Sequence, residues 1–287
     1  MIKKGILKTD ISIGVEKCGV RIIFFTFKNK KIDIKDDYFL ENRLETRVFL
    51  ENKSKSDYIN KIKNSITCNS IKNNIEKYGR IYINIQEADI MLRNINIDLE
   101  IKDEMLKKAT EIEVREYIPN VEKDYILKFR DIERNEEFKC VRTVLFPKKY
   151  KELYGSLCDE IKCDKKYISI NFDILGKLLH ESENIKRGNR LYIECRREDL
   201  IVSKVKDKRI TESYTIRDED LNVSALNQIT ADIEEVYIYG NYKPDIIGMF
   251  SAVSELKEPY FNFDIVVNLG EKEKSVSEYT NLVGFLI

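Results

Sequence analysis

The alternation of apolar and polar positions along the chain changes its period several times. Before residue 86, runs rich in β-branched and aromatic residues predict strands, whereas Tyr58, Ile59, Ile62 and Ile66 recur at the spacing of one helical face. The residues at 29–31 predict a hairpin tip between two of these strands. The expected elements are strands at residues 11–15, 20–27, 46–50 and 80–85, with a helix around residues 58–66.

The middle of the chain carries the clearest pattern. An apolar strand is followed by an amphipathic helix that Pro119 ends, because the residue before a proline is pushed out of the helical region. A strand pair, a second amphipathic helix, a strand and another helix follow. The expected ranges are 89–97 (strand), 103–117 (helix), 125–132 and 138–146 (strands), 148–161 (helix), 166–172 (strand) and 173–181 (helix).

A second cycle begins after Arg187-Gly188-Asn189 and repeats the order of the first. It opens with a meander of strands and then alternates helices with strands, so we expect an α/β protein with an internal duplication and two domains. The expected ranges are 190–195, 200–205 and 209–216 (strands), 223–232 (helix), 235–239 (strand), 244–256 (helix), 262–267 (strand) and 275–287 (helix).

Composition excludes several classes of function. The 287 residues carry 50 basic and 50 acidic side chains, so the chain lacks the basic excess by which proteins bind nucleic acid or anionic membranes through a general electrostatic field. Hydrophobic residues make up 43% of the chain, which is enough for a packed core and excludes disorder.

The sequence also indicates a compartment. The opening MIKKGILKTD is not followed by an apolar stretch of signal-peptide length, and no window approaches the roughly 18 consecutive apolar residues of a membrane span. The cysteines are scattered singly, a pattern that indicates buried thiols in a reducing compartment. We therefore expect a cytoplasmic protein.

The search for catalytic chemistry is negative. His180 is the only histidine, and together with Cys140, Cys158 and Cys163 it matches no zinc-binding spacing. Neither the GxxxxGK[ST] nor the GxGxxG phosphate-binding motif occurs. The residues by themselves therefore predict no enzyme and no metal site.

One stretch of the chain resembles a known family. LKKATEIEVREYIPNVEKDYILKF, residues 106–129, resembles the signature of PilM, the cytoplasmic actin-like protein of type IV pilus assembly, in which a helix ends in a Tyr-Ile-Pro step and leads into a strand. The preceding IMLRNINI is similar to a strand of that family, although the family's proline after this strand is Asp98 here. The duplicated order of elements likewise resembles the actin-like ATPase fold.

The resemblance implies a domain organisation. Residues 1–184 would form domain I, with an inserted subdomain at about residues 86–136, and residues 185–287 would form a reduced domain II with a C-terminal helix. Each domain would hold a mixed sheet flanked by helices. In the family, the interval that corresponds to residues 215–234 holds a helical subdomain beside the nucleotide cleft, whereas little more than one helix fits here.

The expected nucleotide site departs from the family pattern. Actin-like ATPases hold phosphates through two hairpins of apolar-Asp-apolar-Gly pattern. A carboxylate about 4 Å from a phosphate charge costs on the order of 4 kcal/mol at an effective dielectric of 20, and a β-carbon blocks the close backbone approach that glycine permits. The resemblance therefore implies a pseudo-ATPase without a cofactor; the alternative is that the chain still binds ATP with Mg. In the first hairpin, Gly14 stands at the Asp position and Glu16 at the Gly position; in the second, Glu194 stands for the Asp and Arg196 replaces the Gly. On the adenosine side, the family's Gly-Gly has become Gly240-Asn241.

The resemblance also implies a partner. PilM-type proteins bind the N-terminal cytoplasmic tail of PilN in a groove between the core of domain I and its inserted subdomain. This assembly links the pilus motor to the platform proteins in the membrane. Arg93 has the alternative interpretation of a solvated strand charge, and Tyr117 and Ile118 that of ordinary core residues. The groove would be lined by Leu92, Arg93, Ile95, Tyr117, Ile118 and Pro119.

The leading hypothesis is thus a cytoplasmic scaffold of the type IV pilus inner-membrane assembly platform. It would reach the membrane only through a PilN-like partner and would bind no nucleic acid, with a homo-oligomer as a further option. Two alternatives stay open: an ATP-binding actin-like ATPase of an assembly system, and an unrelated two-domain α/β interaction protein.

Overall fold

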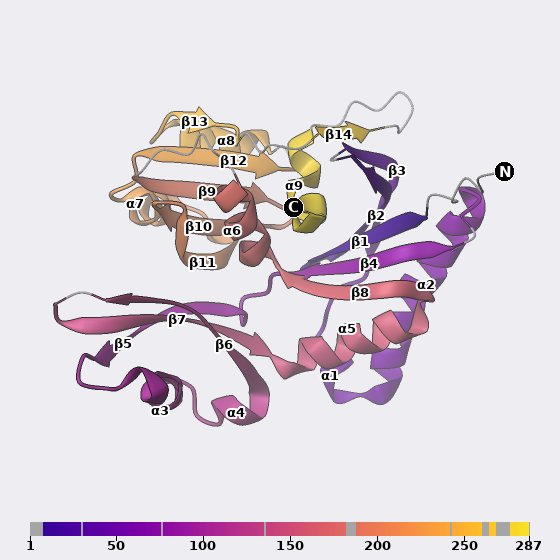
Figure 1. The fold of residues 1–287 in the computed structure, drawn as a ribbon. Helices are drawn as coiled ribbons and strands as arrows, with labels where there is room; N and C mark the ends of the chain where they lie inside the picture. The colour runs from indigo at the N-terminus through magenta and orange to yellow at the C-terminus, as the bar shows by residue number, and fades with distance from the viewer. Residues whose placement is uncertain are drawn as a thin grey trace.

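The computed structural model forms three sheets (Figure 1). Two of them belong to α/β domains, and the third belongs to a smaller subdomain inserted into the first domain. The described N-terminal end lies at the far edge of the first domain, whereas the C-terminal end lies between the two domains. The structure describes residues 8–29, 31–75, 77–134, 136–181, 188–241, 243–259, 264–267 and 276–286.

The sheet of the first domain combines an antiparallel meander with parallel strands. Strand β2 is a nearly continuous apolar run, and β1 is buried along almost its whole length, because both faces of the sheet are covered. Helices α2 (Asn52–Lys72) and α5 (Lys148–Glu160) cover one face, and residues 276–286 cover part of the other. In sheet order the strands are β14 (Asp264–Val267), β3 (Lys31–Glu41), β2 (Gly19–Lys28), β1 (Thr9–Glu16), β4 (Tyr78–Ile85) and β8 (Cys163–Ile170).

The sheet of the second domain repeats this order, which confirms the expected internal duplication. Helix α6 (Asn171–Glu181), at the end of the first domain, packs on one face, and α7 (Val223–Thr230) and α8 (Pro244–Ser251) pack on the other. Between β11 and β12, only one 3-10 turn and α7 are present, as the short interval predicts. The strands are β11 (Arg209–Arg217), β10 (Asp199–Lys206), β9 (Asn189–Cys195), β12 (Glu235–Gly240) and β13 (Leu256–Lys257).

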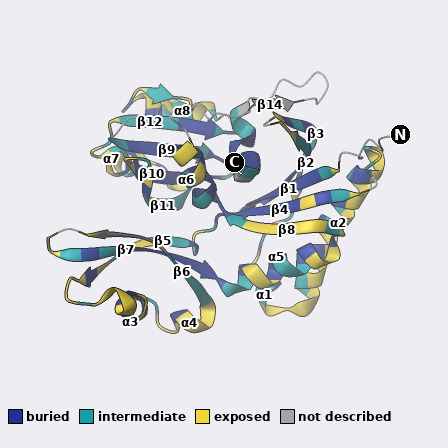
Figure 2. Cartoon of the chain, viewed as in Figure 1, coloured by how far each residue is buried: buried dark blue, intermediate teal, exposed yellow. Residues whose placement is uncertain are grey.

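The inserted subdomain is larger than the sequence indicated. Its sheet has the order β5 (Met91–Asp98), β7 (Phe138–Pro147) and β6 (Tyr125–Arg134). The central strand is β7, so the expected limit at residue 136 is wrong and the subdomain extends to Pro147. Figure 2 shows the outer sides of its helices exposed. These helices are η1 (Asp103–Met105), α3 (Leu106–Tyr117) and α4 (Val121–Asp124).

The last part of the chain departs from the expected second domain. Strand β14 pairs in parallel with β3, so residues 264–267 belong to the sheet of the first domain. In place of one helix at 275–287, the described chain makes three short helical turns between the domains (Figure 1). These turns are η3 (Val276–Tyr279), α9 (Thr280–Val283) and η4 (Gly284–Leu286).

Two local expectations also differ from the structure. Residues 46–50 form the short helix α1 (Arg47–Leu50) because the backbone amides of Val48 and Phe49 bond to carbonyls only three residues earlier. Strand β8 begins and ends earlier than expected, so α6 already starts at Asn171. Among the described helices, none is long and apolar enough to cross a bilayer.

The core of the first domain allows a direct test of this packing. Leu157 of α5 is 0% exposed, whereas Leu50 of α1 is 79% exposed. We expect Leu157→Ala to lower the free energy of unfolding by about 2–5 kcal/mol, and Leu50→Ala to change it by no more than about 0.5 kcal/mol. Urea denaturation followed by circular dichroism measures both. Equal effects of the two substitutions would contradict the placement of α5.

Candidate functional site

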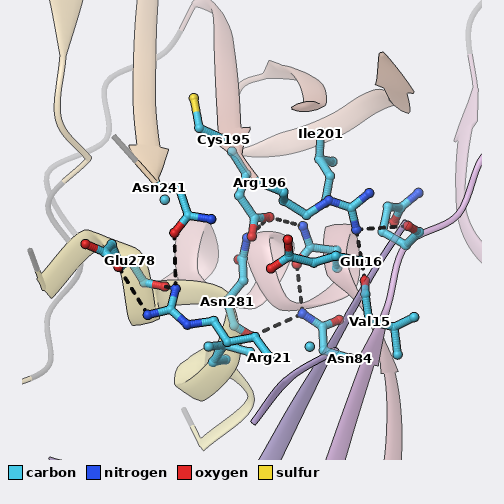
Figure 3. A pocket seen from close by; sticks show the side chains of 16 residues that line it. Val15, Glu16, Arg21, Asn84, Cys195, Arg196, Ile201, Asn241, Glu278 and Asn281 are labelled. Atoms are coloured by element: carbon cyan, nitrogen blue, oxygen red, sulfur yellow. Dashed lines mark hydrogen bonds and ion pairs between the residues drawn. The ribbon is translucent and has the colours of Figure 1, made fainter. Parts of the chain in front are cut away.

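A small cavity lies where the β1–β2 and β9–β10 hairpins of the two domains approach each other (Figure 3). Its volume is about 30 Å³, which leaves room for water but is far below that of a pocket for a small molecule. All of the positions that the sequence placed at the phosphates and the adenosine line this cavity. They are Gly14, Glu16, Glu194, Arg196, Gly240 and Asn241.

Arg196 connects the two domains across this cavity. Its Nε donates to Oδ1 of Asp199 at 2.7 Å, and its Nη1 donates to the carbonyl oxygens of Val15 at 3.0 Å and Gln86 at 3.1 Å. Burial alone would lower the pKa of Arg196, but the Asp199 carboxylate more than reverses this and holds the pKa above its ordinary value. The guanidinium group therefore stays charged and fills the place where the family pattern has a glycine.

In the first hairpin, Glu16 and Gly14 both contact other parts of the same chain. Glu16 accepts a hydrogen bond from the backbone N–H of Arg197 at 3.1 Å, and burial raises the pKa of its carboxyl. A β-carbon at Gly14 would lie 2.6 Å from Cδ2 of Leu282. Gly14 thus gives close approach to the C-terminal segment.

Glu194 lies at the end of β9, facing the segment that follows β14. The side-chain amides of Asn171 and Asn281 both donate to its Oε2. Burial raises the pKa of Glu194 to about 7, and burial likewise raises the pKa of Glu87, which lies near Arg196, to about 7. Two carboxyls at this boundary therefore titrate near neutral pH.

Gly240 and Asn241 close the end of the second sheet. Gly240 has φ +93°, and a β-carbon there would lie 2.4 Å from the carbonyl oxygen of Cys195. The backbone N–H of Asn241 donates to that carbonyl at 2.8 Å. The glycine at this position is accounted for by its own backbone conformation.

Arg21 is a part of the site that sequence reasoning missed. It pairs with Asp37 through two hydrogen bonds of 3.0 and 2.8 Å, donates to the backbone oxygen of Glu278 at 3.1 Å, and lies 4.8 Å from the ring centroid of Tyr279. The only signal in the sequence is a single charge inside the apolar run GVRIIFF. No local pattern marks its partners near the C-terminus.

Mg-ATP does not fit this arrangement of residues. Pockets for small molecules enclose about 300–1,000 Å³, whereas this cavity is about 30 Å³ and is crossed by the Arg196 side chain. The three carboxylates that line it, those of Glu16, Glu194 and Glu278, would repel phosphate oxygens when ionised. Within the described residues, no group of three or more His, Cys, Asp and Glu side chains is placed to hold a metal ion. His180 is exposed at the end of α6.

A second and much larger hollow lies between β5 and α3, within the inserted subdomain and not between it and the core of the first domain as expected. We call it the β5–α3 groove; its volume is about 660 Å³. Of the residues expected to contact a peptide, Arg93, Ile95, Tyr117 and Ile118 line it, and Tyr117 is 75% exposed. The other lining residues are Met91, Asn94, Asn96, Glu113, Val114, Tyr125 and Leu145.

Two of the expected groove residues lie elsewhere. Leu92 does not line the groove because its side chain is buried in the main core, where it is only 6% exposed. Pro119 follows the end of α3 and is exposed outside the groove. The prediction that these two residues line the groove is therefore wrong.

Comparison with known proteins shows the class of the fold. No protein-family model matches the chain, and no curated protein matches it in sequence. A solved structure from Bacteroides thetaiotaomicron, a protein with an actin-like ATPase fold and unknown function, is 10% identical with a TM-score of 0.53, covering 100% of this chain and 98% of that one. The chain therefore has the actin-like fold, as the sequence predicted.

Two further solved structures that are similar to this chain come from pilus and secretion systems. A chain of the PilM–PilN type IV pilus biogenesis complex is 10% identical, with a TM-score of 0.61 over 96% of each chain. The cytoplasmic domain of EpsL, an inner-membrane component of the type II secretion system of Vibrio cholerae, is 8% identical, with a TM-score of 0.57, covering 97% of this chain and 95% of that one. The resemblance to PilM is thus confirmed at the level of the fold.

The buried carboxyls at the domain boundary predict a pH dependence of stability. Because the folded-state pKa of Glu194 and of Glu87, about 7, lies above the ordinary value of 4.5, the folded state binds these protons more tightly than the unfolded chain. Their contribution is complete below pH 4.5 and is lost as the pH rises through 7. We expect the free energy of unfolding to fall by about 3 kcal/mol per group between about pH 5 and pH 8.

Glu194→Gln should flatten this profile, because the amide keeps the shape of the protonated acid. Glu152→Gln, on the exposed side of α5, serves as the matched control and should leave the profile unchanged. Urea denaturation at a series of pH values measures the effect. A free energy of unfolding that stays constant or rises from pH 5 to pH 8 would show that these carboxyls are not buried as described.

Proposed function

We propose that this chain is a cytoplasmic scaffold of a type IV pilus inner-membrane assembly platform, which binds the N-terminal cytoplasmic tail of a PilN-like membrane protein and acts without nucleotide. The observation that carries the proposal is the β5–α3 groove. It lies in the inserted subdomain of a fold similar to that in the PilM–PilN type IV pilus biogenesis complex. The similarity to EpsL supports the wider class, an actin-like component of pilus or secretion assembly.

The chemistry of the groove suits a short peptide with apolar side chains. Its apolar lining would take up such side chains, while Arg93 and Glu113 add one charge of each sign. Tyr117 is a large aromatic side chain that is mostly exposed next to this lining. Tyrosines in such positions often become central contacts when a partner covers them. The apolar lining comprises Met91, Ile95, Val114, Ile118, Tyr125 and Leu145.

The absence of a nucleotide is part of the proposal. The Arg196 bridge and the C-terminal segment occupy the space between the hairpins, and the carboxylate of Glu16 stands where the family pattern has a glycine. The domains are thus held together by contacts within the chain. The alternative, an ATP-binding actin-like ATPase, requires this cavity to open.

A peptide titration tests the partner. We expect a synthetic peptide of the PilN-like tail to bind the full chain with micromolar affinity, measured by calorimetry. Tyr117→Ala should weaken binding at least about tenfold, because it removes an aromatic contact. Ile112→Ala is the matched control, since Ile112 is 49% exposed on α3 and does not line the groove.

Arg93→Glu should also weaken binding and impair pilus assembly in cells, because it reverses the charge in the groove. If the wild-type chain does not bind the peptide and Arg93→Glu assembles pili normally, the pilus assignment is wrong. Binding that Ile112→Ala reduces as much as Tyr117→Ala would place the peptide elsewhere on α3.

A nucleotide titration tests the second part of the proposal. A ligand at about 100 times its Kd stabilises a protein by about 2.7 kcal/mol, which raises the melting temperature by about 5–10 °C for a chain of this size. We expect millimolar Mg-ATP to produce no shift beyond that of Mg²⁺ alone. A shift of that size would favour the ATPase alternative.

A further inference from the structure

The last described segment of the chain contacts both domains. We call residues 276–286 the C-terminal segment; they consist of η3, α9 and η4 and follow β14 along the edge of the first sheet. Three of its apolar side chains are buried, with Tyr279 and Val283 at 0% and Leu282 at 6% exposed. A segment so deeply buried between two domains contributes to how they are joined.

On the first domain, the segment covers the sheet face that α2 and α5 leave free. Tyr279 packs against Ile23 and Phe25, and its hydroxyl donates to Asp37 at 3.0 Å. Leu282 lies against Gly14, where a β-carbon would come within 2.6 Å of it. The side chains that line this face are Ile23, Phe25, Ile32, Ile34 and Tyr82.

Polar contacts fix the register of the segment on the same domain. Arg21 donates to the backbone oxygen of Glu278 and to its carboxylate, both at 3.1 Å. Asn84 donates from its side chain to the backbone oxygen of Asn281 at 3.2 Å. These hydrogen bonds recognise backbone atoms as well as side chains, as in the binding of a peptide.

On the second domain, Asn281 makes the principal contact. Its side-chain amide donates to Glu194 at the end of β9 and to the hydroxyl of Tyr239 on β12 at 3.3 Å. Gly284 lies against α6, where a β-carbon would come within 2.7 Å of Ile174 and 2.8 Å of Leu178. Helix α6 in turn packs on one face of the second sheet, so the segment is connected to the cores of both domains.

We propose that the cavity between the hairpins is a peptide-binding site whose ligand is the chain's own C-terminal segment, which takes the place that a nucleotide has in an actin-like cleft and bonds the two domains together. Leu282 occupies the space over Gly14, Asn281 bridges to Glu194, and Tyr279 lies against Arg21. The site recognises a Tyr-Thr-Asn-Leu-Val sequence, residues 279–283. This inference concerns residues outside the β5–α3 groove and does not depend on the pilus assignment.

A chain that ends at Ser275 provides the first test. We expect its melting temperature to fall by at least about 5 °C, because it exposes the apolar face that Tyr279, Leu282 and Val283 cover. A synthetic peptide of residues 276–286 should bind the shortened chain saturably and restore the lost stability, whereas a peptide of scrambled sequence should not. An unchanged melting temperature, or a folded shortened chain that does not bind the peptide, overturns the proposal.

If the shortened chain does not fold, point substitutions in the full chain still test the proposal. Gly14→Ala should lower the melting temperature of the full chain by about 3–9 °C, because its β-carbon displaces Leu282. In a Leu282→Ala background, the same substitution should have little effect. Gly155→Ala in α5 is the matched control, since a β-carbon there meets no atom within 4 Å. Additive effects of Gly14→Ala and Leu282→Ala would show that the segment does not bind at Gly14.

These outcomes are separable from those of the proposed function. The melting curves and the peptide of residues 276–286 do not involve the β5–α3 groove, so they can fail while the PilN-like peptide still binds. Conversely, loss of the groove partner would leave the contact between Leu282 and Gly14 unaffected.

Discussion

The guanidinium group of Arg196 is removed from water at the boundary of the two domains, and the cost of that burial constrains the residues around it. A buried charge is tolerated only when it is paired and its donors are satisfied. Asp199 supplies the counter-charge from the same hairpin, while Val15 and Gln86 supply carbonyl oxygens from the other domain. The donors of Arg196 are satisfied only when the domains are closed, so the closed arrangement and the buried charge require each other.

The same buried charges explain the contacts that the C-terminal segment makes. With an arginine at the centre and carboxyls at Glu16 and Glu194, the boundary is suited to amides and backbone groups more than to phosphate. Asn281 meets this requirement by donating to Glu194, and Leu282 fills the space beside Gly14. Gly14 stands where the family pattern has an aspartate, and here it allows the close approach of the C-terminal segment.

The sequence predicted the fold well, because strand meanders and amphipathic helices are local patterns. It also predicted the positions around the cavity, since Glu16 and Arg196 stand in recognisable hairpins. It did not predict that β14 returns to β3 or that Leu282 lies against Gly14, because such contacts join residues far apart in the chain and leave no local signature. The error at Leu92 has the same cause, since it packs in the main core with residues far from it in the chain.

The inserted subdomain that holds the β5–α3 groove contacts the second domain directly. Asn94, which lines the groove, donates from its side chain to the backbone oxygen of Thr211 on β11 of the second domain at 3.2 Å. The position of β11 relative to β5 depends on how the two domains are closed, and Arg196 and the C-terminal segment hold that closure from within the chain. Under the proposed function, the groove would therefore keep its shape without a nucleotide cycle, which is what a permanent scaffold at the membrane requires.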